Sequence, residues 1–155
     1  MSGVGITFGF DDGPIRRHLA ALALLHASGF DRARREIGEY MVGEVQDNLR
    51  SQKLVDGTAM PPSKAAQKRG DAEHSGKTLI AKGHLRDSYT YNLVPGGVEV
   101  GSGKVYAAIH HFGGETGRPG HRFTMPARPV LGLNADGERE VGDILLGELR
   151  RAQRV

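Results

Sequence analysis

The chain has 155 residues, no cysteine, and a net charge of +3 from 21 Lys and Arg against 18 Asp and Glu. Its length predicts one domain over residues 1–155 that buries roughly two-thirds of its extended-chain surface on folding. The longest apolar run, residues 19–25, is far below the roughly 18 residues that cross a bilayer, and no basic segment leads into an apolar core at the N-terminus. Composition therefore excludes a disulfide framework and predicts a soluble cytoplasmic product.

Two helices are predicted before residue 53. Pro14 suits a first-turn position and opens a helix over residues 15–27, which Gly29 ends. Asp31 is a suitable N-cap for a second helix that reaches Gln52. The apolar positions of the first helix are Leu19, Leu22, Ala23 and Leu25. Those of the second, which recur every four residues and should pack on a sheet, are Ile37, Met41, Val45 and Leu49.

The excess positive charge lies in residues 51–86, which hold seven cations against three anions, whereas the rest of the chain holds fourteen against fifteen. The segment has few large apolar residues before Leu79, so we expect a long, flexible, mobile loop over residues 53–82. Either the loop is only solvated surface, or it contacts DNA or an acidic partner. Lacking interleaved aromatics, it would touch DNA only at phosphates, without sequence specificity. The candidate contact residues are Lys64, Lys68, Arg69 and Lys77.

An antiparallel hairpin and a C-terminal helix are predicted downstream. Residues 88–94 and 98–100 alternate as strands around Pro95-Gly96-Gly97, and residues 122–125 are a further short strand candidate. A helix over residues 135–152 is capped by Asn134, and its predicted buried face is Val141, Ile144, Leu145 and Leu149. The predicted fold class is α+β: a small antiparallel β-sheet packed by N-terminal helices and a C-terminal helix.

Residues 98–131 form a distinctive block. The pattern predicts a strand at 98–100, a flexible turn at 101–103, and an apolar run at 105–109 that ends at Gly113-Gly114. Pro129 restrains the connector and pushes Arg128 to an extended conformation, which predicts a guanidinium presented at low entropic cost. Two roles for Arg128 stay open: contact with another subunit or partner, or a pair within its own subunit with a carboxylate such as Glu36 or Glu140.

Two enzyme-like patterns are weak. Gly76-Lys77-Thr78 matches the end of a phosphate-binding loop, but the glycine spacing upstream fails and no strand precedes it. His110 and His111 are adjacent, so their side chains diverge on a strand or a helix, which disfavours a shared metal. We expect His110 to make a local hydrogen bond that fixes the turn before Gly113 and His111 to be partly exposed. Asp11-Asp12 and the serines have no spacing typical of catalysis, so we predict no enzyme, cofactor or metal.

The 98–131 block resembles the signature of the virion morphogenesis, or tail completion, proteins of Mu-like tailed phages. Two further segments are similar to that family: residues 37–52 with Asp56-Gly57 resemble its N-terminal helix and turn, and residues 83–88, Gly-His-Leu-Arg-Asp-Ser, resemble its entry to the sheet. The chain departs from the pattern after Asp-Gly, where the family usually has Trp and this chain has Thr58-Ala59-Met60.

The resemblance implies a structural protein of the virion, assembled in the host cytoplasm, that completes the tail or neck and enables head–tail joining by binding, not catalysis. A tail terminator that caps the tube, and a non-specific DNA-binding module, are the alternatives. Partners would be tail and neck proteins and further copies of the chain in a ring, six if the ring matches tail symmetry, with possible DNA contact in the channel. The candidate interface residues are Arg128, Tyr106, His110 and Phe112.

Overall fold

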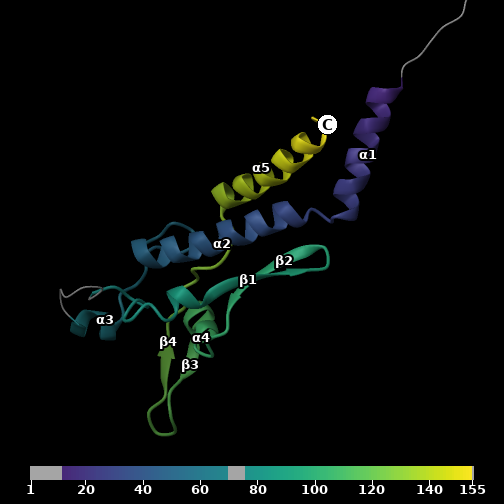
Figure 1. Cartoon of the computed structure of the whole chain (residues 1–155). Coiled ribbons are helices and arrows are strands. Elements are labelled where there is room, and N and C mark those ends of the chain that lie inside the picture. Colours follow the sequence, from purple (N-terminus) through teal and green to yellow (C-terminus); the bar gives the residue numbers. More distant parts are fainter. Residues whose placement is uncertain (1–11, 70–75, 155) are drawn as a thin grey trace, which may run out of the picture.

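A computed structural model describes residues 12–69 and 76–154, and the predicted α+β class is confirmed (Figure 1). The helices are α1 (Gly13–Ala27), α2 (Asp31–Ser51), α3 (Lys64–Arg69), the 3-10 turn η1 (Arg86–Ser88), α4 (Ala107–Phe112) and α5 (Ala135–Ala152). The strands are β1 (Tyr89–Val94), β2 (Gly97–Ser102), β3 (Gly114–Thr116) and β4 (Phe123–Met125). They form two separate two-stranded antiparallel sheets, β1–β2 and β3–β4.

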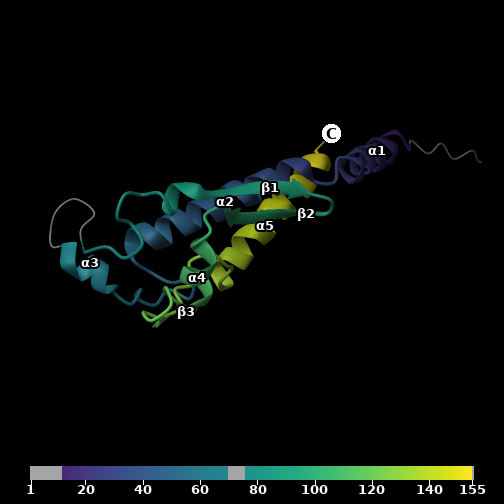
Figure 2. The same cartoon turned by 90° about the horizontal axis from the view of Figure 1, so that it is seen from below.

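Helix α2 is the centre of the fold. It lies between α5 on one side and the β1–β2 hairpin on the other, and the hairpin runs along it in the view from below (Figures 1 and 2). Met41, Val45 and Leu49 are buried, so the predicted apolar stripe is confirmed at these positions. Gly38 permits the close approach, because a Cβ built there would lie 2.4 Å from the Tyr91 ring.

Of the two predicted N-cap residues, Asn134 is confirmed and Asp31 is wrong. Asn134 caps α5 as predicted, since its side-chain Oδ1 accepts a 2.8 Å hydrogen bond from the Gly137 N–H. Asp31, predicted as the N-cap of α2, is instead its first residue. The N-cap is Phe30, which follows Gly29, and both have positive φ. The Asp31 carboxylate is turned to the Arg34 guanidinium and so is not used as a cap.

The predicted hairpin is confirmed, with Val94 paired to Gly97 across a two-residue turn. The expected flexible turn at 101–103 is wrong for its first two residues, because Gly101 and Ser102 continue β2 and pair with Thr90 and Tyr89.

The strand candidate at 122–125 is confirmed as β4. It pairs with β3, which sequence patterns did not indicate because each strand has only three residues.

The core lies where the C-terminal half of α2 meets the start of β1. Its buried members are Val45, Leu49, Met60, Ile80, Leu85, Tyr89 and Val130. Three of these, Met60, Ile80 and Leu85, come from the basic segment at 51–86. The described part of the expected loop at 53–82 is thus mostly exposed and irregular, but it is anchored in the core by Met60 and Ile80 and contains the short helix α3; residues 70–75 lie outside the described residues. Whether the segment is mobile stays a prediction.

The apolar residues of α1 are mostly exposed, and the predicted buried face of α5 is only partly buried. Leu25 is the one buried residue of α1, while Leu19 is 60% and Leu24 72% exposed. On α5 Ile144 is buried, but Leu145, expected in the core, is exposed. Helix α1 packs at one end of α5 (Figure 1), and Ile15, Leu19 and Leu24 on it remain exposed. No helix among the described residues is long and apolar enough to cross a membrane.

Candidate interaction cleft

A cleft of about 890 Å³ opens between α3 with its flanking segments and the wall formed by α4, β4 and Arg128. Its positively charged residues are Lys64, Arg69, Lys82 and Arg128, and no Asp or Glu among residues 12–69 and 76–154 lines it. Much of the remaining lining is apolar: Pro62, Ala65, Leu79, Ala81, Leu85, Phe123, Met125 and Pro126. Apolar surface beside unopposed positive charge suits a ligand that combines hydrophobic and acidic groups.

Arg128 forms part of the cleft wall from inside the molecule. The residue is 4% exposed, and its Nε donates a 3.0 Å hydrogen bond to the Pro61 carbonyl oxygen, with a longer 3.5 Å contact from Nη1 to Pro126 O. The guanidinium, expected to be presented at low entropic cost, is thus directed into the protein and almost wholly buried. The suggested pairs with Glu36 or Glu140 are also absent, and Glu36 lies instead 3.7 Å from Arg151. A contact with a partner inside the cleft stays a prediction.

The main chain ties the two parts of the wall together. The Arg128 N–H donates a 2.9 Å hydrogen bond to the His110 carbonyl oxygen, which joins α4 to the connector after β4. Gly113, at φ +70°, ends α4 with no room for a side chain, because a Cβ there would lie 2.6 Å from the Ala127 nitrogen and 2.8 Å from the Met125 oxygen. Residues 106–110 and 123–128 thus build one wall of the cleft, and Val130, just beyond it, lies in the core.

His110 lines the cleft, and its Nδ1 is buried without a hydrogen-bond partner among the described residues. The expected hydrogen bond from the His110 ring to the turn is therefore not observed at this atom, and the ring packs edge-on to Tyr106 at 6.0 Å between centroids. Burial, and then the positive charge of Arg128, lower the pKa of His110 below its usual value. Burial also lowers the pKa of His111, which is half-buried as expected.

We expect acid to destabilise the protein through these two histidines. In the unfolded chain the two imidazoles take up protons at about pH 6.5, whereas in the folded protein they do so only at a lower pH. The stability that the neutral histidines contribute is therefore present above about pH 6.5 and is lost as the pH falls below it. Urea unfolding from about pH 7.5 to about pH 5.5 should show this loss. His110→Gln and His111→Gln should each reduce it, and the double variant more. A double variant with the full parental pH dependence would contradict the assignment.

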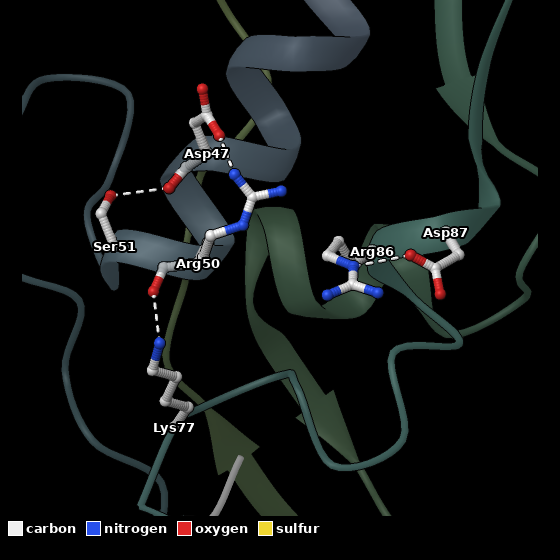
Figure 3. Close-up of polar contacts among 6 residues, drawn as sticks. All are labelled: Asp47, Arg50, Ser51, Lys77, Arg86 and Asp87. Atoms are coloured by element: carbon white, nitrogen blue, oxygen red, sulfur yellow. Dashed lines mark hydrogen bonds and ion pairs between the residues drawn. The ribbon is translucent and has the colours of Figure 1, made fainter. Parts of the chain in front are cut away.

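The four predicted loop cations fall into two classes. Lys64 and Lys68 are exposed on α3 and have no side-chain hydrogen bond or ion pair within the described part of the chain. Arg69 donates from Nη2 to the Lys77 carbonyl oxygen at 2.7 Å. Lys77 donates from Nζ to the Arg50 carbonyl oxygen at 2.9 Å, so its ammonium caps the C-terminal end of α2 beside the Asp47–Arg50 pair (Figure 3). Arg69 and Lys77 therefore already hold the segment in place.

The Gly76-Lys77-Thr78 motif, which resembles the end of a phosphate-binding loop, has a structural role through its last residue. Thr78 is fully buried, its Oγ1 accepts a 2.9 Å hydrogen bond from the Ser63 N–H, and its own N–H donates to Gln52 Oε1. These bonds fasten residues 63 and 78 to the end of α2. Among the described residues, no three His, Asp or Glu side chains are grouped so that they could hold a metal ion.

Residues 83–88, the Gly-His-Leu-Arg-Asp-Ser segment, form the entry to the β1–β2 hairpin. Leu85 is buried, and Ser88 Oγ donates to Leu85 O at 2.7 Å and lies 2.6 Å from Ser102 Oγ. Arg86 Nε donates to Asp87 Oδ1 at 2.6 Å (Figure 3). That hydrogen bond, together with the positive charge of Arg86, lowers the pKa of Asp87. The Gly-x-Leu-Arg-x-Ser residues therefore have structural roles in starting β1.

The cleft unites some predicted site residues and leaves others out. Lys64, Arg69, Tyr106, His110 and Arg128 line it, although they come from two distant parts of the sequence. Phe112 is 77% exposed but lies outside it, as do Lys68 and Lys77. Sequence reasoning missed further lining residues, among them Leu79, Lys82, His84, Phe123 and Met125. No pattern in the sequence links these positions, because only tertiary packing brings α3 opposite β4.

Comparison with known proteins gives two similar phage proteins. The chain is 35% identical over 79 residues to the putative capsid assembly protein G of Escherichia phage Mu, across 51% of each chain. It is 38% identical over 66 residues to the Mu-like prophage FluMu G protein 2 of Haemophilus influenzae, across 43% of this chain and 47% of that protein. The chain thus spans about half the length of these relatives in the alignments. No solved structure matches it. A family profile matches residues 10–150, and the chain belongs to the phage virion morphogenesis family.

Proposed function

We propose that this protein completes the phage tail, or the neck where the tail meets the head, so that the two particles join. Family membership over residues 10–150 is the observation that carries the proposal. The name of the phage Mu relative refers to capsid assembly, which is consistent with a role near the head. In this proposal the protein acts by binding other virion proteins through complementary surfaces.

The exposed face of α3 is the proposed docking surface for an acidic partner. Lys64 and Lys68 are exposed four residues apart on one helix, without an ion pair in the described residues, so their charges are available. Long-range attraction between a positive surface and a negative partner raises the rate of productive encounter. The helix is fixed by the burial of Ala66 and by the Ala66 N–H bond to Ser63 Oγ, so the two lysines are held on an ordered support.

A phage that carries Lys64→Gln and Lys68→Gln in this gene tests the proposal. We expect head–tail joining to fall by roughly tenfold, because steered association depends steeply on such charges. Unjoined heads and tails would be counted by electron microscopy of lysates. The protein itself should remain folded, since surface charges without partners change stability by less than about 0.5 kcal/mol.

A matched control removes two exposed cations elsewhere, with Arg35→Gln and Lys104→Gln. It changes the net charge equally and should leave joining intact. Equal yields of joined particles from both double variants would reject α3 as the docking surface. Salt-sensitive binding of DNA by the purified parent, lost in Lys64→Gln with Lys68→Gln, would instead favour non-specific phosphate contact as the role of these lysines.

A further inference from the structure

The cleft has features that specify its occupant. Its four cations, which face no carboxylate in the part of the chain that the structure describes, favour a segment with negative charge, and its apolar lining favours large hydrophobic side chains. One wall is β4, which pairs with β3 on one side and with no other strand among the described residues. A strand with an unpaired side can accept an extended segment through main-chain hydrogen bonds. The expected occupant is therefore an extended, hydrophobic and acidic stretch of polypeptide.

Such a stretch occurs in this chain outside the described residues. Val4, Ile6, Phe8 and Phe10 alternate with glycine or threonine, and Asp11 follows them. Alternation with a period of two places all four apolar side chains on one face of an extended segment. No Lys, Arg or His occurs before Arg16, so the charge of the side chains in residues 1–11 comes from Asp11 alone. Both the hydrophobic pattern and the sign of the charge are complementary to the cleft.

The segment cannot enter the cleft of its own chain. With Phe10 in the cleft, only two residue steps would remain to Asp12, which span at most about 7 Å. Asp12 is the N-cap of α1, and α1 lies at the end of the molecule opposite to α3 (Figures 1 and 2). Helix α2 alone has 21 residues and a length of about 31 Å, and it separates α1 from the cleft. A segment bound in the cleft must therefore come from another copy.

We propose that residues 4–11 of one copy of this chain bind in the cleft of a neighbouring copy, extended beside β4. Apolar side chains of the segment would lie against residues such as Leu79 and Met125, with Asp11 near the cations at the cleft rim. The contact joins two different surfaces, so each copy offers one segment and one cleft. Repeated contacts of this kind produce a closed ring or an open filament. The inference concerns self-association alone and does not depend on a role in head–tail joining.

Disulfide trapping tests the proposal cleanly, because the chain has no cysteine. A full-length Thr7→Cys chain would be mixed with a full-length Thr124→Cys chain that carries a size tag, and covalent heterodimers would be followed on non-reducing gels. Thr124 lies on β4 in the cleft wall. We expect heterodimers to form at least roughly tenfold faster than by random collision, because binding raises the effective concentration of the two thiols.

The matched control pairs the Thr7→Cys chain with a Thr90→Cys chain. Thr90 is also an exposed strand threonine, but it lies on β1 outside the cleft. Phe8→Ser with Phe10→Ser in the Thr7→Cys chain should reduce trapping at Thr124 to the control rate, which would support the segment as the occupant. Equal rates at Thr124 and Thr90 would overturn the proposal. So would a disulfide within one chain when Thr7→Cys and Thr124→Cys are combined and the protein is diluted.

Discussion

Gly113→Ala is expected to lower the free energy of unfolding by about 3 kcal/mol, the largest effect of any single methyl addition that we propose. Two causes act together. The φ of +70° is unfavourable for a residue with a Cβ, and the added carbon would lie 2.6 Å from the Ala127 nitrogen and 2.8 Å from the Met125 oxygen. Both atoms belong to the main chain of the cleft wall, so neither can move aside as a side chain would. Urea denaturation measures the loss.

Gly96→Ala separates the two causes. Gly96 has a similar φ of +74° in the hairpin turn, but nothing lies within 4 Å of a Cβ built there. Gly96→Ala should therefore lower the free energy of unfolding by about 1 kcal/mol, the cost of a positive φ for a residue with a Cβ. If the two variants lose equal stability, the contact between Gly113 and the connector does not matter. A larger loss in Gly113→Ala establishes that α4 must press against residues 125–127 to form the wall.

Arg128→Lys is expected to destabilise the protein by about 2 kcal/mol, or roughly 4–8 °C in Tm, although the charge is kept. The guanidinium donates from Nε to Pro61 O while nearly the whole residue is buried. A lysine ammonium lies at the end of a longer flexible stem and has no donor at the Nε position, so the carbonyl of Pro61 loses its partner. Differential scanning calorimetry of the purified variant measures the shift.

Arg139→Lys is the control for this substitution. Arg139 is exposed on α5, where its Nη1 lies 2.8 Å from Asp136, and a lysine can keep that ion pair. Its Tm should be nearly unchanged. The phage carrying Arg128→Lys distinguishes the two open roles of Arg128. A parental Tm with unjoined heads and tails would assign Arg128 to a partner contact, whereas a lowered Tm with reduced infectivity would assign it to the wall of its own subunit.

Local features of the sequence predicted most of the secondary structure. Pro14 and Asn134 lie where α1 and α5 begin, and the stripe of Met41, Val45 and Leu49 faces the core, because capping and helical periodicity depend on neighbouring residues alone. The hairpin was predictable for the same reason, since its two-residue turn and alternating strands are contiguous. The three-residue strand β3 was missed because so short a strand carries no measurable period.

The basic segment shows where composition misleads. Its charge and prolines indicate a solvated loop, yet Met60, Ile80 and Leu85 enter the core and Thr78 is fully buried. A few apolar residues far apart in a polar segment have no periodicity, so nothing local distinguishes an anchored segment from a free one. The outcome depends on whether another element offers a surface to cover them, and here the end of α2 does so.

The sequence by itself determined the α+β class, the ends of the long helices, the hairpin and the likeness to phage morphogenesis proteins, since each depends on residues close together in the chain. Only the tertiary structure decided the cleft and the environment of Arg128. The proline-restrained connector predicted a stiff backbone, but the burial of the side chain follows from the carbonyl of Pro61, 67 residues away in sequence. Contacts of that range depend on how elements pack, because a buried donor must find its acceptor wherever the fold brings one near.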